Sequence, residues 1–328
     1  KSLIENKFLI ESLEISTKAL NVKDFISFLR FFNNNPKLYL LEKIIKKGYL
    51  IADINFDFDE NGNLKNNYKI NGFIKDTRIS IFKKYEVNKL NFIFNYEKNF
   101  LDVNDLKLSI NDLNFFSKNL NIKNIKNEFV INGEIENKNI EFKDNNIALF
   151  IKPIFSNLDI NKIRLSSNTK FAFKINKEFK LNNLDLVSKI DLDEFLFLNN
   201  LKLKKNFPKI KKNINLSNHK LEIKYQKKQL KINGSGDVLL QNKNDKLIYS
   251  ITKDNNNYNF KTSLKIKENP FVLDFLNYEK KENSEILIKV DGNKKPNNKI
   301  KFNSISLEEK NNKFNINGLV LNEKLKIT

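Results

Sequence analysis

The sequence contains no cysteine, no methionine and no tryptophan, and its only histidine is His219. The lack of cysteine excludes disulfide bonds, thiol nucleophiles and cysteine-ligated zinc. One histidine is too few for a metal centre built from several imidazoles. The sequence also lacks a phosphate-binding glycine loop, a dinucleotide-binding motif and an HExxH motif. We therefore predict that the protein is not an enzyme and has no catalytic residue, no metal site and no cofactor.

Long apolar runs are missing as well. The longest, Ile147 to Ile151, is far shorter than the roughly 18 residues that a membrane-spanning helix requires. We therefore predict that no segment of the chain crosses a bilayer. Because methionine is absent even at position 1, we expect the chain to be part of a longer protein and an upstream targeting or anchoring segment to lie outside it.

Apolar side chains are nevertheless abundant: 40% of the 328 residues are hydrophobic and 29 are phenylalanine. A chain with this much apolar surface to bury is not intrinsically disordered. Glycine and proline are scarce, with eight and five residues. The composition therefore predicts a folded protein.

The charge is strongly one-sided, since 59 basic residues against 39 acidic ones give a net charge of +20. Such a balance is typical of proteins that bind nucleic acid or anionic membranes. Only three of the basic residues are arginine, however, and the lysines are scattered and form no stripe. Arginine is the residue that base and phosphate recognition favours. We interpret the lysines as a solvated surface, with weak attraction for anionic lipid headgroups as the alternative.

Alternation of apolar and polar residues recurs along nearly the whole chain, which is the pattern of strands with one buried face. Clusters of Asn, Asp, Lys and Gly separate the alternating stretches, for example Asp59 to Asn63 and Asp254 to Asn257, as turns do. This spacing favours about 20 antiparallel strands in a meander. We predict a mainly β fold whose main element is a long, curled antiparallel sheet.

Helical periodicity is confined to a few places. The apolar residues of 25–32 and of 38–45 fall on one helix face, with Gly48 placed as a C-terminal cap after the second helix. A third short helix is predicted at 270–279, where Pro270 suits the first turn. We therefore divide the chain into an N-terminal strand and helical segment, 1–48, and a continuous β region, 49–328.

One tripeptide, Ile-Asn-Gly, occurs four times within alternating stretches, ending at Gly72, Gly133, Gly234 and Gly318. Glycine inside a strand usually marks a bulge, a bend or a close backbone approach. The spacings are irregular, so these tripeptides indicate a recurring bend and not a strict repeat.

Two polar features are assigned to the surface. The acidic group Asp57, Asp59 and Glu60 resembles half of a calcium loop, but the carboxylate expected at the twelfth position is missing, so we predict a solvated turn. His219 lies in a polar stretch between Leu216 and Leu221, where we expect an exposed imidazole.

The apolar side of the strands is the candidate binding surface. A sheet face this rich in Phe, Ile and Leu needs a cover, which a second sheet, closure of the sheet or an apolar ligand can supply. Exposing a lipid acyl chain of about 15 methylenes to water costs on the order of 12 kcal/mol, so its transfer between membranes needs a continuous apolar lining. The residues predicted to line a lipid groove are Ile54, Phe56, Phe92, Phe94, Leu106, Leu108, Phe129, Ile131, Phe171, Phe173, Ile223, Phe260, Leu264, Ile288, Phe302, Phe314 and Ile316.

Several stretches resemble a known group, the AsmA-like envelope proteins of Gram-negative bacteria, to which TamB and YhdP belong. In the C-terminal half they are Asn269-Pro270-Phe271, Leu273 to Tyr278, Ile286 to Gly292, Ile305 to Glu309 and Phe314 to Ile327; near the N-terminus they are the helices ending at Gly48, Ala52 to Phe58 and Tyr68 to Ile74. The resemblance covers most of the chain in character, although its motifs are loose.

The resemblance implies a repeating β-groove with a U-shaped cross-section and an apolar interior. It also implies a periplasmic protein that is anchored in the inner membrane by an N-terminal helix, meets a partner at the outer membrane and carries phospholipid for outer-membrane biogenesis. This chain contains neither the anchor nor a recognisable outer-membrane docking end. The family has no catalytic residues to transfer.

Three hypotheses follow. The first is a periplasmic lipid-transfer groove whose ligands are phospholipid acyl chains and which binds no nucleic acid. The second is a β-solenoid scaffold or adhesin with a closed, dry core and no lipid. The third is a basic nucleic-acid-binding protein, which would lose affinity steeply with salt.

Overall fold

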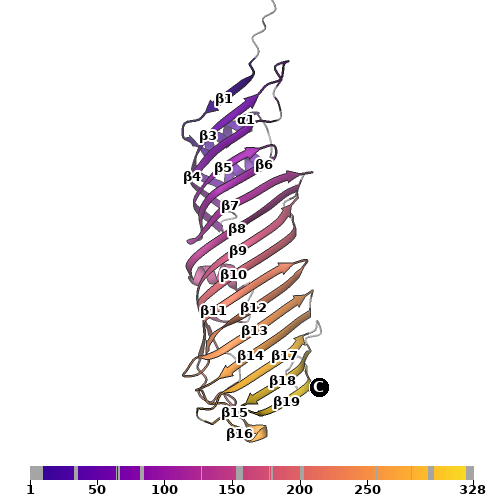
Figure 1. Ribbon diagram of the computed structural model, residues 1–328. Helices are drawn as coiled ribbons and strands as arrows, with labels where there is room; N and C mark the ends of the chain where they lie inside the picture. The colour runs from indigo at the N-terminus through magenta and orange to yellow at the C-terminus, as the bar shows by residue number, and fades with distance from the viewer. Residues whose placement is uncertain are drawn as a thin grey trace, which may run out of the picture. The chain divides into compact units, whose positions relative to one another are not determined.

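The computed structural model (Figure 1) describes residues 10–32, 36–63, 65, 67–81, 85–126, 128–152, 158–176, 178, 180–199, 203–255, 257–281, 283–294 and 299–322. The chain divides into two compact units. Unit 1 comprises Lys1–Asn137 and Lys170–Asn183, and unit 2 comprises Lys138–Thr169 and Leu184–Thr328. Residues 1–9 of the expected N-terminal segment lie outside the described residues.

The prediction of a mainly β fold is confirmed, because 17 antiparallel strands belong to one sheet. The elements of unit 1 are β1 (Ser12–Ser16), β2 (Leu20–Asn21), α1 (Val22–Phe32), α2 (Pro36–Ile44), β3 (Ile45–Asp57), β4 (Lys69–Ile81), β5 (Tyr85–Glu97), β6 (Phe100–Ile110) and β7 (Leu113–Ile125). Strands β8 (Glu128–Phe142), β9 (Ile160–Ile175) and β10 (Leu181–Leu198) have residues in both units.

Unit 2 contains α3 (Asp144–Asn146), the π-helical turn η1 (Ile147–Ile151), β11 (Asn213–Gln226), β12 (Gln229–Leu239), β13 (Asp245–Asp254), β14 (Asn257–Ile266), β15 (Val272–Leu273), the 3₁₀ turn η2 (Asp274–Leu276), β16 (Tyr278–Glu279), β17 (Ile286–Lys294), β18 (Ile300–Glu309) and β19 (Asn312–Leu321).

Strands that follow one another along the chain are also neighbours in the sheet. In unit 1 the pairs run without a gap from β3 to β8, and both β1 and β2 pair with β3. In unit 2 they run from β10 to β14, then to β17, β18 and β19. Strands β15 and β16 pair with each other outside the main sheet. This is the meander that the spacing of the turns predicts.

The connections between strands are tight, and they depend on residues that tolerate a left-handed backbone. Both central residues of the β5–β6 turn, Lys98 and Asn99, have positive φ, at 47° and 66°. Positive φ at both positions is the requirement of a two-residue type I′ turn, whose twist matches that of the strands. At the end of β3 the carboxylate of Asp59 accepts hydrogen bonds from the backbone of Asn61 and Asn63 at 2.9 and 2.8 Å. The predicted turn at Asp59 to Asn63 is therefore confirmed.

Three strands of unit 1 are interrupted by bulges. Asp76 in β4, Lys89 in β5 and Asp105 in β6 have φ of 47°, 51° and 50°, and the register between these strands shifts next to each of them. A bulge bends its strand and increases the local twist. The sequence did not reveal these bulges, because Asp and Lys at these positions look like ordinary polar members of an alternating strand.

The two N-terminal helices are confirmed, and they pack on the sheet of unit 1. Val22 and Ile26 of α1 form a buried cluster with Ile45, Leu50 and Ala52 of β3. Helix α1 begins after Asn21, whose side chain accepts a hydrogen bond from the Lys23 N–H at 2.9 Å, as an N-cap does.

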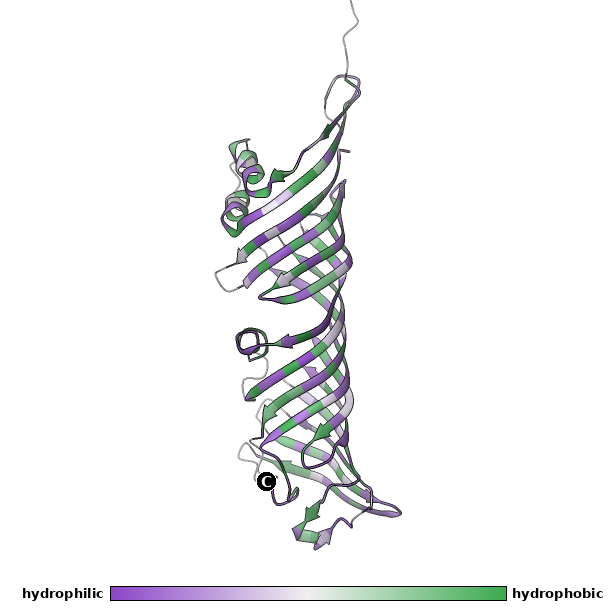
Figure 2. Cartoon of the chain, turned by 90° about the vertical axis from the view of Figure 1, so that its left-hand side faces the viewer, coloured by the Kyte–Doolittle hydropathy of each residue, from purple (hydrophilic) through white to green (hydrophobic). Residues whose placement is uncertain are grey.

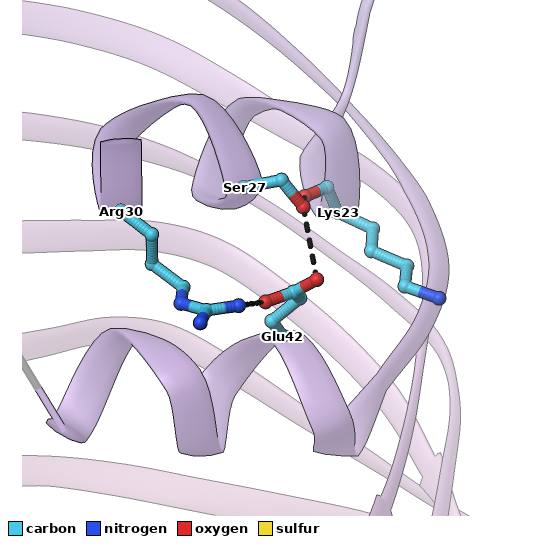
Figure 3. Close-up of polar contacts among 4 residues, drawn as sticks. All are labelled: Lys23, Ser27, Arg30 and Glu42. Atoms are coloured by element: carbon cyan, nitrogen blue, oxygen red, sulfur yellow. Dashed lines mark hydrogen bonds and ion pairs between the residues drawn. The ribbon is translucent and has the colours of Figure 1, made fainter. Parts of the chain in front are cut away.

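One carboxylate joins the two helices (Figure 3). Glu42 of α2 pairs with the Arg30 guanidinium and accepts a hydrogen bond from the Ser27 hydroxyl at 3.1 Å; Ser27 also donates to the Lys23 carbonyl at 3.0 Å. The hydrogen bond from Arg30 is the main reason why the pKa of Glu42 lies below its usual value. These contacts hold α1 and α2 side by side.

Two helix predictions were wrong. Gly48 does not cap α2, which ends at Ile44; it lies inside β3 with φ of 147°, and a Cβ there would collide with the side chain of Thr77. The expected helix at 270–279 is one 3₁₀ turn, η2, between β15 and β16. Val272 there exchanges 3.0 Å hydrogen bonds with Asn206, and Asn277, with φ of 49°, ends the turn.

Two of the four Ile-Asn-Gly glycines do not mark bends. Gly72 and Gly234 are paired in register, each opposite an aromatic residue of the next strand, Phe94 and Tyr249. A Cβ on either glycine would collide with that ring. The predicted bend is therefore wrong at these sites, because the glycine makes room for an aromatic ring.

The other two repeats differ from each other. Gly133 accepts the ring of Phe171, whose Cζ would lie 3.3 Å from an added Cβ. Gly318 has φ of 72° and nothing within 4 Å of the place of a Cβ, which is the backbone conformation expected of a bend. Gly292, outside the repeat, is covered by Phe260, so the same packing recurs where the tripeptide is absent.

We predict that Gly234→Ala destabilises the protein by about 1–3 kcal/mol, because the added methyl group must displace the Tyr249 ring. Urea unfolding followed by circular dichroism measures the effect. In a Tyr249→Ala background the same substitution should cost little, since the ring is gone. Equal costs in both backgrounds would contradict the assigned packing.

Candidate functional site

The predicted groove residues of unit 1 lie on one face of its sheet. The register defines two adjacent rows on this face, which we call the apolar face of unit 1. One row is Ile54, Ile70, Tyr96, Leu101, Ile122 and Ile131, and the other is Ala52, Gly72, Phe94, Val103, Leu120 and Gly133. Phe171 joins this face over Gly133. The rows continue unbroken across six strands, which the alternation of single strands does not reveal.

The predicted residues of unit 2 also share one face, which we call the apolar face of unit 2. One row is Ile223, Ile232, Ile251, Phe260, Gly292 and Phe302. A second is Ile190, Leu221, Gly234, Tyr249, Thr262, Val290, Ile305 and Ile316, and a third is Leu264, Ile288, Leu307 and Phe314. In both units the alternation of hydrophilic and hydrophobic residues along the strands is visible in Figure 2.

Aromatic rings are in contact along these faces. In unit 1 Phe56 lies 6.4 Å from Tyr68, centroid to centroid, and Tyr68 lies 5.8 Å from Tyr96. Phe171 stacks on Phe173 at 5.7 Å. Further close pairs are Phe92 with Phe94 at 6.1 Å in unit 1 and Phe260 with Phe302 at 6.0 Å in unit 2. The groove residues thus form continuous apolar surfaces within each unit.

These surfaces are only partly covered. Of the 17 predicted groove residues only Leu106 is buried, with 8% of its surface exposed; Phe129 is 37% exposed and the others are half-buried. A sheet face in the middle of a sandwich would bury such side chains almost completely. Among the described residues, no second large sheet is present to lie on this face.

Short segments cover parts of the apolar faces. In unit 1 these are α1 and α2, described above. In unit 2, Ile147 of η1 packs on Ile160, Ile163 and Leu192. Elsewhere in unit 2, Phe207 and Phe271 lie edge to face at 5.3 Å, in a buried cluster that includes Ile214, Val238, Ile266 and Ile286. The buried core is therefore assembled in patches beneath these segments.

A large depression of unit 2 lies on the opposite, polar face. Its volume is about 1150 Å³ and it crosses eight strands, from β10 to β19. From β10 to β17 its lining includes residues of both faces, among them Leu221, Tyr249 and Val290 of the second apolar row, but in β18 and β19 it consists of polar-face residues alone. Its floor is built of small side chains such as Ser235, Ser250 and Ser304. The predicted groove residues do not line this hollow.

The charges at the rim of this depression are largely paired. Lys261 meets Asp291 at 3.0 Å, and Glu308 meets Lys289 at 2.8 Å and Lys313 at 3.1 Å. These partners hold the pKa of the Glu308 carboxyl below its usual value, and a hydrogen bond from Asn303 followed by one from Lys261 does the same for Asp291. The hollow therefore offers no concentration of one charge to a ligand.

His219 is buried and not exposed as predicted. Only 1% of its surface is accessible, because a bulge between Ser217 and Lys220 turns it onto the apolar face, where Gly236 leaves space for its ring. Nε2 lies 2.9 Å from the Asp237 carbonyl, and Nδ1 has no hydrogen-bond partner. Nε2 therefore carries the proton of the neutral ring. Burial lowers the pKa of His219 below its usual value.

We expect His219 to make unit 2 less stable in mild acid. The unfolded histidine titrates near 6.5, as free histidine does, so lowering the pH below that value protonates the unfolded state first and reduces the free energy of unfolding. Hydrogen exchange of the β11 and β12 amides between neutral pH and mild acid measures this loss. His219→Gln keeps a donor to the Asp237 carbonyl and should remove the histidine's part of the pH dependence. An unchanged pH profile in that variant would refute the assignment.

A second buried polar group of unit 2 is the Asp245 carboxylate, whose residue is 2% exposed. Asp245 accepts a 2.8 Å hydrogen bond from Asn269, which also bonds to the backbone of Lys243. The other carboxylate oxygen of Asp245 has no partner. Burial raises the pKa of Asp245 to about 6. This cluster fixes the β12–β13 connection against the segment after β14.

Titration of Asp245 should change the free energy of unfolding with pH in the direction opposite to that expected for His219. Its folded pKa is raised from 3.8 to about 6, so its contribution to stability is fully present below pH 3.8 and is lost as the pH rises through 6. The difference of about two pKa units corresponds to about 3 kcal/mol. Comparing the unfolding free energies of the wild type and Asp245→Asn across this range tests the sign. Parallel pH profiles would contradict it.

Comparisons with known proteins identify no relative. No family model, no curated protein and no solved structure matches this chain. The resemblance to AsmA-like proteins therefore remains a prediction. Among the described residues, no helix has the length and apolar character needed to cross a membrane, and no group of three or more His, Asp or Glu side chains is arranged to hold a metal ion.

Proposed function

We propose that this chain is a non-catalytic segment of a lipid-transfer protein, in which the apolar faces of units 1 and 2 accommodate phospholipid acyl chains. The observation that carries the proposal is the partial exposure of the 17 predicted groove residues, which share one face within each unit. Exposed hydrocarbon is costly in water, at about 0.8 kcal/mol for each methylene group. A protein that retains so much of it gains from a ligand of matching chemistry.

The shape of the apolar rows favours acyl chains over compact ligands. Four of the five rows cross six or more neighbouring strands and the fifth crosses four, with mostly apolar or aromatic residues at each step, and neighbouring strands are about 4.8 Å apart. An extended hydrocarbon chain makes equivalent contacts at every step along such a row. The polar atoms that would fix one small molecule in one orientation are scarce there.

The two rival hypotheses have less support. A dry scaffold requires a sealed core, whereas most residues of the apolar faces are only half-buried. A nucleic-acid binder requires a concentrated basic surface, whereas the lysines are scattered along the chain, and three of those at the polar depression, Lys261, Lys289 and Lys313, are paired with carboxylates. In this proposal the protein acts in the periplasm. An N-terminal helix of the longer protein anchors it in the inner membrane, and a separate partner meets it at the outer membrane.

Phe94→Asp and Phe260→Asp should each strongly reduce the lipid that copurifies with the protein, because a carboxylate on the apolar face cannot be solvated beside an acyl chain. Lipids extracted from the purified protein and quantified by mass spectrometry provide the measurement. The chain offers matched controls in Ile93→Asp and Ile248→Asp, which place the same charge on the polar faces; these side chains are 44% and 58% exposed.

Lipid bound to the wild type and to both controls, and lost from both apolar-face variants, would support the proposal. A wild-type protein that carries no more lipid than an unrelated β-rich protein prepared in parallel would refute it. Equal lipid in all four variants would also refute it, since the apolar faces would then not be the binding surface.

A further inference from the structure

Helices α1 and α2 present apolar residues outward as well as inward. Val22 and Ile26 of α1 face the sheet and are buried, whereas Phe28 and Phe31 of the same helix are 59% and 86% exposed. In α2, Leu40 is 50% exposed. A surface helix of a soluble protein normally turns polar residues to the solvent. We call Phe28, Phe31, Tyr39, Leu40 and Leu41 the outer apolar patch.

The residues of the outer apolar patch are not members of the buried cluster that seats α1 on the sheet of unit 1. The inward face already supplies the contacts that seat α1 on β3. The two helices are joined by the polar contacts of Glu42 with Arg30 and Ser27 (Figure 3). Neither set of contacts accounts for the apolar surface that Phe28 and Phe31 leave accessible to solvent, at 59% and 86% of each residue.

The charges around the patch have one predominant sign. Lys23, Lys43, Lys46 and Lys47 are exposed, while the only acidic residues of the two helices are Asp24 and Glu42, and Glu42 is paired with Arg30. Tyr39 lies under two cations, with Arg30 at 4.8 Å and Lys43 at 5.3 Å from its ring centroid. Aromatic and aliphatic side chains flanked by lysines are the composition of helices that lie in the interface of an anionic membrane.

We propose that α1 and α2 dock on the surface of an anionic lipid bilayer, with the outer apolar patch among the headgroups and upper acyl chains and the flanking lysines on the phosphates. The docking is peripheral and needs no spanning segment, because the apolar side chains enter only the interfacial layer. Cations close to an anionic surface strengthen this attraction. Binding of the protein to vesicles should therefore require both the outer apolar patch and anionic lipid in the bilayer.

The absence of tryptophan from the chain makes a direct test possible. Phe31→Trp introduces a single indole at the most exposed residue of the patch, and Phe275→Trp places one in η2 of unit 2, at a residue that is 66% exposed. Each variant is mixed with vesicles of phosphatidylcholine alone and with vesicles in which about a third of the lipid is phosphatidylglycerol. We expect a blue shift of the emission, and quenching by acyl-brominated lipid, only for Phe31→Trp and only with the anionic vesicles.

A second measurement separates docking from a change in folding. The double variant Phe28→Ser and Phe31→Ser should lose at least tenfold in partitioning to anionic vesicles, as measured by flotation, with unchanged thermal unfolding. Phe275→Ser is the matched control and should float like the wild type. High salt should weaken the flotation of the wild type, because the lysine contribution is screened.

Three results would overturn the inference. The first is no emission shift for Phe31→Trp with anionic vesicles. The second is an equal shift at Phe275→Trp. The third is a blue shift of Phe31→Trp that grows with protein concentration in the absence of vesicles, which would assign the patch to a second copy of the chain.

Docking of α1 and α2 on a bilayer and binding of acyl chains by the apolar faces are separate events. Phe260→Asp should strongly reduce copurified lipid while leaving vesicle flotation intact, and the Phe28→Ser and Phe31→Ser double variant should do the reverse. Failure of one experiment therefore leaves the other unaffected.

Discussion

The antiparallel register of neighbouring strands is the constraint on which the rest of this structure depends. Side chains in a strand point to alternate faces, so a slip of one residue would exchange the apolar and polar faces of a strand. Within each unit the register holds through several bulges, and apolar residues therefore meet apolar residues from strand to strand. The continuous faces proposed to hold lipid, and the surfaces on which the covering segments pack, both follow from this register.

Much of the fold could be predicted from the sequence, because each strand carries its own period-two pattern and each turn its own Asn, Asp or Lys. The predicted groove residues share a face in each unit for the same local reason. Local patterns do not show how the side chains of one strand pack against those of the next. The space at Gly72 and Gly234 is filled by rings that belong to neighbouring strands, and the burial of His219 depends on a bulge and on Gly236.

The helices show the same limit. The apolar spacing of α1 predicts a helix and its inward face, but the exposure of Phe31 becomes visible only when the position of the sheet is known. At 270–279 the local signals for a helix were outweighed by two hydrogen bonds that tie the Val272 backbone to the carbonyl and the side-chain amide of Asn206, far away in the sequence. The polar depression of unit 2 is likewise formed by eight strands together, and the sequence of no single strand predicts it.

The pairing of a glycine with an aromatic ring on the adjacent strand couples the substitutions that the two positions can accept. At Gly234 with Tyr249, where the three atoms nearest to an added Cβ all belong to the tyrosine side chain, neither residue can be exchanged freely while the other stays as it is. A side chain gained at the glycine has to be matched by a smaller residue across the ladder. In related chains these positions should therefore vary as couples, and such couples would mark neighbouring strands even where the sequences have otherwise diverged.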